Sequence, residues 1–155
     1  MTVNVYDPFV EESALTKLGV NKVELDKIIV ESDYISPHVP LTDKTKNMLS
    51  SKEFDLMKDG VKIINVARGG VINEKALLEA INNGKVSAAA LDVYESEPAT
   101  NKELVTNEHV IATPHLGASS HEAQVNVAVE IAEQVVLALK ENTIKNCVNN
   151  VSELK

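Results

Sequence analysis

The sequence predicts an α/β protein whose parallel sheet is doubly wound by helices. Short apolar runs with strand character alternate along the chain with amphipathic, helix-like segments. Alternation of this kind implies parallel strands joined by right-handed crossovers. The composition agrees, because hydrophobic residues make up 44% of the 155 residues and aromatic residues only 3%. A core of Val, Ile, Leu and Ala suits a sheet that helices cover.

Five apolar runs are the expected strands. Each is short, rich in aliphatic residues and followed by residues that favour turns. The runs are Thr2–Tyr6, the region around Tyr34–Ile35, Val61–Val66, Ser87–Val93 and Val110–Thr113.

Two helices are expected in the first half of the chain. Leu25–Val30 has the spacing of a short helix with one apolar face. Ser50–Lys58 opens with a capping-box pattern, in which Ser50 is followed three residues later by Glu53, and it stops at Gly60.

Two further helices are expected in the second half. Asn73 can cap a helix that runs through Asn82 and ends at Gly84. Ser119 and Glu122 form another capping-box pattern ahead of the longest helix, which extends to about Lys140. Its apolar positions recur at helical spacing: Ala123, Val127, Ile131, Val135 and Leu139.

Charge and cysteine content argue against several classes of partner. A net charge of −8 and a pI near 5.0 lack the basic footprint that nucleic-acid binding needs. Cys147 is the only cysteine, so no internal disulfide framework forms and a cytoplasmic location is favoured. No signal peptide or apolar stretch of membrane-spanning length is evident, and no Cys/His cluster has metal-ligand spacing. We therefore expect a cytoplasmic protein with no membrane or metal partner.

Three charged residues each follow the end of an expected strand. Arg68 precedes two glycines, Glu97 precedes Pro98, and His115 lies within Thr113–Gly117. In open α/β sheets, ligands bind outside the carboxyl ends of the strands. The three side chains are therefore predicted to form an active site on one edge of the sheet.

The three residue types are chemically complementary. A guanidinium can bind a carboxylate through two hydrogen bonds, and an imidazole exchanges protons near neutral pH. A carboxylate beside the imidazole would orient the ring and favour its protonated form. Such a set suits proton removal from a hydroxyl during hydride transfer from a 2-hydroxy acid to a nicotinamide. The residue types also suit some hydrolytic or lyase chemistry, and each has a plain alternative: Arg68 in a surface glycine turn, His115 in a loop, Glu97 in an acidic loop.

Asp7 and His38 are weaker candidates. An acid at the end of the second strand of a dinucleotide fold binds the adenosine ribose and favours NAD over NADP, but Asp7-Pro8 is equally a turn sequence. His38 follows an expected strand and is as suited to a loop as to the site.

Four segments resemble signature motifs of one family, the NAD-binding domain of the D-isomer-specific 2-hydroxyacid dehydrogenases. They are Tyr34–Thr42, Asn65–Gly70, Leu91–Pro98 and Thr113–Ser120. The combination in this order is specific, and the resemblance runs through almost the whole chain. The stretch Leu116–Gln124 is similar to the branch that oxidises 3-phosphoglycerate.

The resemblance implies roles for particular residues. Arg68 would bind the substrate carboxylate and polarise its carbonyl, His115 would be the general acid/base, and Glu97 would be the partner of His115. Asp7 matches the ribose-binding acid and Asp92 a residue near the nicotinamide carboxamide. Further positions match the lining of the cofactor site: His38, Val39, Pro40, Asn65, Val66, Ala67 and Gly117.

The resemblance also implies ligands and partners. NAD would be the cofactor, and a small D-2-hydroxy acid, with 3-phosphoglycerate favoured, the substrate. Oxidation of that substrate opens serine biosynthesis in this family. A homodimer is expected by the same resemblance.

The chain departs from the family in one respect. No Gly-x-Gly-x-x-Gly can be made from its six glycines, and the family places that loop just before the segment beginning at Thr2. We therefore expect a Rossmann-like sheet that is incomplete at its N-terminal βα unit, with a partial NAD-binding domain over residues 1–142. Residues 143–155 would be a return segment toward a separate substrate domain, carried mainly by Ile144–Val151. The isolated chain is expected to be poorly active or inactive.

Three other functions remain open on sequence grounds. The family includes NAD-sensing corepressors that keep a similar trio, which makes a non-catalytic binding module an alternative. Another 2-hydroxyacid dehydrogenase, such as a glyoxylate or hydroxypyruvate reductase, is a second. A fragment whose stability comes from a partner chain is the third.

Overall fold

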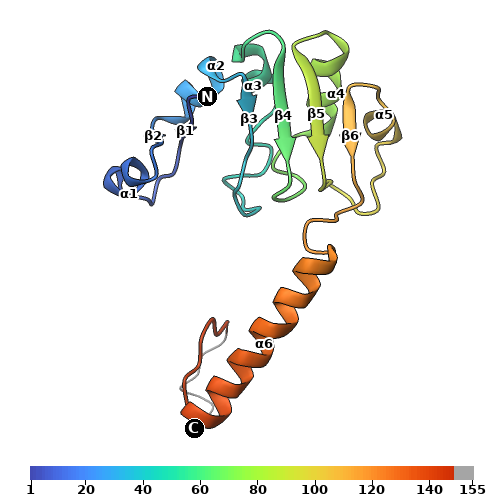
Figure 1. Cartoon of the computed structure of the whole chain (residues 1–155). Helices are drawn as coiled ribbons and strands as arrows, with labels where there is room; N and C mark the ends of the chain where they lie inside the picture. The colour runs from blue at the N-terminus through green and yellow to red at the C-terminus, as the bar shows by residue number, and fades with distance from the viewer. Residues whose placement is uncertain (149–155) are drawn as a thin grey trace. The chain divides into compact units, whose positions relative to one another are not determined.

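The computed structural model describes residues 1–148 in two compact units, Met1–His115 and the chain from Leu116 onward. Each unit is described by itself. The residues that the sequence predicts for catalysis all lie in the first unit, which is an α/β structure (Figure 1).

All strand pairs of the first unit are parallel. β1 (Asn4–Val5) pairs with β2 (Asn21–Lys22) in a two-stranded sheet. A four-stranded sheet has the order β3-β4-β5-β6, built from Tyr34–Ile35, Val61–Asn65, Val86–Leu91 and Val110–Ala112. The predicted class, a doubly wound Rossmann-like sheet, is confirmed by this topology.

The break between the two sheets falls at a defined position. In a sheet of order 3-2-1-4-5-6, strand 1 lies between strands 2 and 4. Here β1 and β2 pair only with each other and β3 is an edge strand of the other sheet, which agrees with the expectation that β1 and β2 correspond to strands 2 and 3 and β3 to strand 4. The sheet is therefore interrupted where the sequence predicts an incomplete βα unit.

Five short helices connect the strands of the first unit. They are α1 (Glu12–Lys17), α2 (Leu25–Glu31), α3 (Ser51–Leu56), α4 (Glu74–Asn82) and α5 (Lys102–Val105). The sequence predicts α2, α3 and α4 but neither α1, α5 nor β2. α1, β2 and α5 are six, two and four residues long and lack a clear apolar period, so their patterns are too short to distinguish from loops.

Side-chain caps explain where α3 and α4 begin. The backbone N–H of Ser50 donates to the Glu53 carboxylate at 3.1 Å, as the capping-box pattern predicts. The Asn73 side chain accepts from the N–H of Ala76 at 2.9 Å, which satisfies one of the unpaired donors of the first turn of α4.

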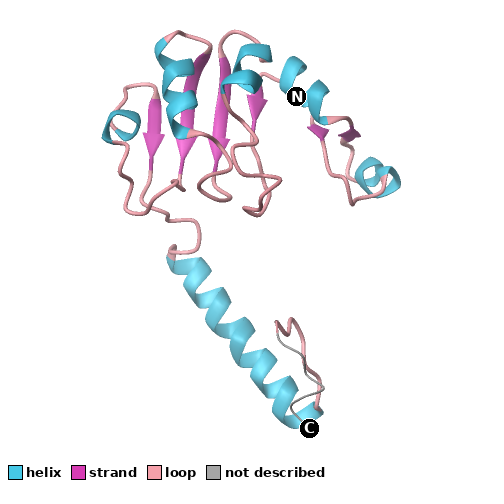
Figure 2. Ribbon diagram, turned by 180° about the vertical axis from the view of Figure 1, so that it is seen from behind, coloured by secondary structure: helices cyan, strands magenta, loops and turns pink. Residues whose placement is uncertain are grey.

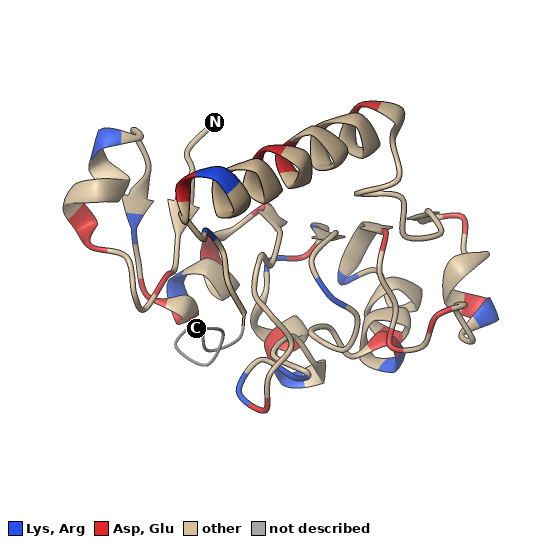
Figure 3. Cartoon of the chain, turned by 90° about the horizontal axis from the view of Figure 1, so that it is seen from below, with Lys and Arg blue, Asp and Glu red and all other residues tan. Residues whose placement is uncertain are grey.

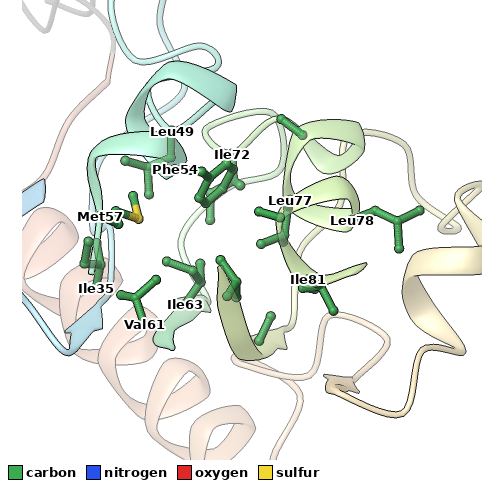
Figure 4. Close-up of a cluster of buried hydrophobic side chains, with 14 of the residues drawn as sticks. Ile35, Leu49, Phe54, Met57, Val61, Ile63, Ile72, Leu77, Leu78 and Ile81 are labelled. Carbon is green, nitrogen blue, oxygen red and sulfur yellow. The ribbon is translucent and has the colours of Figure 1, made fainter. Parts of the chain in front are cut away.

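The core lies between the sheet and the helices α3 and α4, which cover the face seen in Figure 2. Along β4, Val61 and Ile63 are buried while Lys62 and Ile64 are only partly buried, so one face of the strand carries the core. Leu77 of α4 is fully buried against this face. The side chains labelled in Figure 4 belong to this core, and among those labelled Phe54 is the one aromatic ring: Ile35, Leu49, Phe54, Met57, Val61, Ile63, Ile72, Leu77, Leu78 and Ile81.

Charged residues are spread along the described chain. Figure 3 shows Lys and Arg positions singly interspersed with Asp and Glu positions. In residues 1–148, no helix is both long enough and apolar enough to cross a membrane.

The second unit contains the longest helix, α6 (His121–Glu141). The predicted cap is wrong by one residue: the Ser120 side chain, not that of Ser119, accepts from the N–H of Ala123, at 3.2 Å. The two consecutive serines are equally good caps, and the backbone turn decides between them. The helix ends at Asn142, which has the left-handed conformation with φ of 49°.

The expected return segment lies only partly within the described structure. Residues 149–155, which include the end of Ile144–Val151, lie outside the described residues. The division proposed at residue 142 stays a prediction.

The core predicts a clear difference between two Leu→Ala substitutions in the first unit. Leu77→Ala removes a side chain that is 0% exposed, so it should lower the free energy of unfolding by about 2–5 kcal/mol. Leu18→Ala removes a side chain that is 76% exposed and should change it by less than about 0.5 kcal/mol. Urea denaturation followed by circular dichroism measures both. Equal losses would contradict the assigned core.

Candidate active site

The three predicted catalytic residues follow three neighbouring strands. Arg68 follows β4, Glu97 follows β5 and His115 follows β6, and these strands are adjacent and parallel. Their carboxyl ends therefore lie along one edge of the sheet, at the lower end of the strand arrows in Figure 1.

His115 and Glu97 are in direct contact. Nδ1 of His115 lies 2.7 Å from Oε2 of Glu97, although the two residues are eighteen positions apart in the sequence. Their side chains are 47% and 39% exposed, so the pair is accessible. The hydrogen bond from His115 is the largest influence on Glu97 and lowers the pKa of that carboxyl below its ordinary value. Partial burial opposes this effect, and the backbone N–H of Tyr94 reinforces it.

The backbone of His115 has an uncommon conformation. Its φ is 57°, in the left-handed region that residues other than glycine rarely adopt. Such a conformation costs roughly 1–2 kcal/mol per residue. The surrounding contacts must offset this cost, and strained residues of this kind concentrate at functional sites.

Tyr94 links the ends of β5 and β6. Its buried hydroxyl lies 3.1 Å from the carbonyl oxygen of Leu91 and 2.8 Å from that of Thr113. Its backbone N–H donates to Oε1 of Glu97 at 3.2 Å. One residue therefore contacts both the carboxylate and the segment that leads to His115. Burial raises the pKa of the Tyr94 phenol, which keeps the hydroxyl protonated as a donor.

Asp92 and Thr113 make a second link between the same strand ends. The Thr113 hydroxyl donates to Oδ1 of Asp92 at 2.6 Å, and the N–H of Asp92 donates to the carbonyl oxygen of Asn65 at 3.0 Å. Asp92 is buried. These bonds connect the ends of β4, β5 and β6 in one row.

Asn65 shapes the turn that carries Arg68. The Asn65 side chain donates to the carbonyl oxygen of Arg68 at 3.0 Å and accepts from the N–H of Ala67 at 3.1 Å. The exposed guanidinium of Arg68 donates to the carbonyl oxygen of Ala67 at 2.6 Å. Within the described residues, no hydrogen bond or ion pair joins Arg68 to Glu97 or His115. Arg68 therefore lies at the same edge of the sheet, with its guanidinium bonded to its own turn.

Gly69 brings the Arg68 turn against the loop that carries Glu97. A Cβ placed on Gly69 would lie 1.7 Å from the carbonyl oxygen of Tyr94. Only glycine permits this approach between the two backbones.

The residues predicted to line the cofactor site are spread over more elements than the three catalytic candidates. Oδ1 of Asp7 accepts from the N–H groups of Phe9 and Val10 at 2.8 and 3.1 Å, which closes a turn after β1, and the ribose-binding role of Asp7 stays a prediction. The His38 ring lies 2.9 Å from the Ser36 hydroxyl. Val66 is exposed beside Ala67 at the end of β4, and Val39 and Pro40 lie in the loop after β3. Gly117 belongs to the second unit.

Sequence reasoning missed Tyr94, Gly69 and Thr113 as structural parts of the site. Tyr94 offered a signal, because it is one of only three tyrosines and follows the expected strand Ser87–Val93 directly. The packing of Gly69 on Tyr94 had no signal in the sequence, since the two lie on different connections.

Comparison with known proteins identifies the family. Residues 1–117 match the D-isomer specific 2-hydroxyacid dehydrogenase, NAD binding domain. D-3-phosphoglycerate dehydrogenase of Bacillus subtilis (strain 168) is 47% identical over 149 residues, which cover 96% of this chain and 28% of that protein. Hydroxypyruvate reductase of Thermotoga maritima is 47% identical over 138 residues, covering 87% of this chain and 44% of that protein. A crystal structure of a glyoxylate reductase from Paecilomyes thermophila has a TM-score of 0.85 and 32% identity, covering 100% of this chain and 46% of that one.

The chain belongs to the D-isomer specific 2-hydroxyacid dehydrogenase family and contains its NAD-binding domain. NAD is the cofactor of this domain. The chain spans less than half the length of these relatives.

The Gly69 contact predicts a local response to substitution. Gly69→Ala should displace the Tyr94 carbonyl and lower stability by about 1–3 kcal/mol, the range typical of overpacking. Gly84→Ala is the matched control, because Gly84 has φ of 81° but no atom within 4 Å of the added Cβ. Amide chemical shifts of Tyr94–Glu97 should change only in Gly69→Ala. If they change in neither protein, the contact between the two loops is not as described.

The His115–Glu97 pair predicts a pKa response. His115→Gln removes the hydrogen bond that most lowers the pKa of Glu97, so this pKa should rise toward its ordinary value. Because the folded pKa is lowered, the pair stabilises the protein above the unfolded pKa of Glu97, and this contribution is lost as pH falls through the folded pKa. Carbon-13 NMR titration of the glutamate Cδ atoms measures the shift. His109→Gln, which removes a ring 3.9 Å from Glu108, should leave Glu97 unchanged.

Proposed function

We propose that this chain is the part of an NAD-dependent D-2-hydroxyacid dehydrogenase that carries its acid/base pair, with 3-phosphoglycerate as substrate. The 2.7 Å contact between His115 and Glu97 at the carboxyl edge of the parallel sheet is the observation that carries the proposal. The family and the dehydrogenases that it resembles support the same reaction class.

His115 is assigned the proton transfer. An ionised Glu97 accepts a hydrogen bond from Nδ1–H of His115, which leaves Nε2 as the atom that accepts the proton of the substrate hydroxyl. The lowered pKa of Glu97 keeps this carboxylate ionised near neutral pH, where its charge stabilises the imidazolium that forms. A bound nicotinamide would supply the hydride acceptor, and the 2-hydroxy acid would leave as a 2-keto acid.

Arg68 is assigned the substrate carboxylate. Its guanidinium makes one hydrogen bond, to the carbonyl oxygen of its neighbour Ala67, and is exposed at the same edge as His115. A carboxylate would offer two charge-assisted hydrogen bonds in place of this one, which favours rotation of the side chain toward the substrate.

The residues present fit the two ends of a dinucleotide. Asp7, which follows β1, is assigned the adenosine ribose, and Asn65–Ala67 with Asp92, at the ends of β4 and β5, are assigned the nicotinamide end. His38–Pro40 follow β3, which pairs with β4 in the four-stranded sheet. Gly117, Asp7 and these residues are proposed cofactor contacts by resemblance to the family.

Two observations bear on the substrate. The D-3-phosphoglycerate dehydrogenase of Bacillus subtilis is matched over 96% of this chain, which favours 3-phosphoglycerate and hence a step in serine biosynthesis. The hydroxypyruvate reductase of Thermotoga maritima is 47% identical as well, so reduction of hydroxypyruvate or glyoxylate is the second candidate. A corepressor-like binding module is the non-catalytic alternative. That the protein forms a homodimer and is cytoplasmic stays a prediction; light scattering tests the first and cell fractionation the second.

A hybrid enzyme tests the proposal. This chain would replace the corresponding segment of the Bacillus subtilis D-3-phosphoglycerate dehydrogenase, and NAD reduction with 3-phosphoglycerate would be assayed beside reduction of hydroxypyruvate and glyoxylate. His115→Gln in the hybrid should lower kcat by about 10²–10⁴-fold, the usual size of an acid/base contribution. His109→Gln should leave kcat unchanged, since this ring lies before β6 and away from the carboxyl edge.

The outcomes separate the candidates. Turnover of 3-phosphoglycerate that depends on His115 supports the proposal, whereas preference for hydroxypyruvate or glyoxylate assigns the second candidate. A folded hybrid that binds NAD but turns over none of these acids contradicts catalysis.

A further inference from the structure

Two glutamates outside the proposed catalytic set exchange hydrogen bonds with each other's backbone. The N–H of Glu74 donates to Oε1 of Glu95 at 3.0 Å, and the N–H of Glu95 donates to Oε1 of Glu74 at 2.6 Å. We call this pair of bonds the Glu74–Glu95 clasp. The two residues are twenty-one positions apart, so the clasp joins separate parts of the chain.

The clasp connects the two loops on which the proposed site is built. Glu74 is the first residue of α4 and lies at the end of the connection that carries Arg68. Glu95 lies in the connection after β5, two residues before Glu97. The contact of Gly69 with the Tyr94 carbonyl joins the same connections at a second point.

The clasp and the Glu97 carboxylate bind the N–H groups of two consecutive peptide units. The N–H of Glu95 is held by Glu74, and the preceding N–H, that of Tyr94, donates to Oε1 of Glu97 at 3.2 Å. Consecutive peptide planes share one Cα atom, so fixing the Glu95 N–H restricts the direction of the Tyr94 N–H. Oε2 of the same Glu97 carboxylate contacts His115.

The clasp brings two carboxyl groups of like charge close together, which is electrostatically unfavourable. Glu74 is a buried carboxyl, and burial raises its pKa; the Glu95 N–H opposes this rise, and the Glu95 charge adds to it. Asp92 and Glu97 add further acidic groups to the same loop. A structural cap alone is already provided for α4 by Asn73. The bond from the Glu95 N–H to the Glu74 carboxylate satisfies no donor of the helix, because Glu95 lies in the connection after β5, so this bond acts on that connection.

We infer that Glu74 and Glu95 are positioning residues, which fix the loop of Glu97 relative to the turn of Arg68 so that the carboxylate meets His115. For its catalytic consequence the inference rests on the proposed function, but the geometry that it describes does not. Loss of either half of the clasp should let the Tyr94–Glu97 segment move and weaken the His115–Glu97 bond.

The experiment uses the full 155-residue chain and needs no turnover. Glu95→Ala removes the acceptor for the Glu74 N–H, and Glu74→Ala removes the acceptor for the Glu95 N–H. In each, the pKa of Glu97, followed by carbon-13 NMR, should rise toward its ordinary range by at least about 0.5 unit. Hydrogen exchange at the Tyr94 and Glu95 amides should quicken at least about 10-fold, which corresponds to about 1.4 kcal/mol.

Matched variants separate positioning from loss of charge or of fold. Glu95→Gln keeps an oxygen acceptor and should restore the Glu97 pKa to within about 0.2 unit of the parent value. Glu79→Ala removes an exposed acid of the same helix and should change neither readout. If an alanine variant does not fold, Glu95→Gln and Glu74→Gln are compared with the parent instead. Each glutamine side chain keeps an oxygen acceptor, so the backbone N–H groups of Tyr94 and Glu95 should stay protected from exchange in both variants.

The contrary results are equally definite. An unchanged Glu97 pKa in folded Glu95→Ala and Glu74→Ala proteins overturns the inference, and so does loss of amide protection in both Gln variants. If the hybrid enzyme is inactive while the Glu97 pKa shifts as expected, the proposed function fails and the positioning role stands. If the hybrid enzyme is active and depends on His115 while the Glu97 pKa is unchanged in the alanine variants, the positioning role is rejected and the acid/base assignment stands.

Discussion

Parallel pairing of β4, β5 and β6 is the constraint on which the site depends. Parallel neighbours end at the same edge of a sheet, so residues that follow three different strands become neighbours in space. Arg68, Glu97 and His115 are distant in the sequence and each lies just beyond one of these ends. The paired strands thus fix the approximate position of each residue, and the loops determine the final positions of the side chains.

Hydrogen bonds between the loops determine these final positions. The Tyr94 hydroxyl contacts the carbonyl oxygens of Leu91 and Thr113, and Thr113 in turn donates to Asp92. The left-handed backbone of His115 is held at the end of this network. Groups held in this way lose little additional freedom when a substrate binds, which is the physical basis of a preorganised site.

The acidic loops are stabilised mainly by hydrogen-bond donors rather than by cations. Among the described residues, the carboxylates of Glu74, Glu95 and Glu97 accept backbone N–H groups of the same two connections. Backbone donors can compensate a carboxylate without adding a mobile side chain, because their positions are fixed by the fold. Among the described residues of the site, the Glu97 carboxylate also lies 2.7 Å from Nδ1 of His115. A neutral imidazole beside a fixed carboxylate is well suited to accepting a proton, because the carboxylate stabilises the imidazolium that forms.

The sequence by itself determined the class of fold, most helix starts and the candidates for catalysis. Periodicity and caps were sufficient for α2, α3 and α4, and strand ends identified Arg68, Glu97 and His115, because these signals are local. The tertiary structure alone decided that Glu97 contacts His115, that the Arg68 guanidinium bonds to the Ala67 carbonyl, and that Asp7 closes a turn. It also decided the roles of Gly69, Tyr94 and the Glu74–Glu95 clasp. These depend on contacts between connections that follow different strands, and a contact of that kind leaves no regular spacing in the chain.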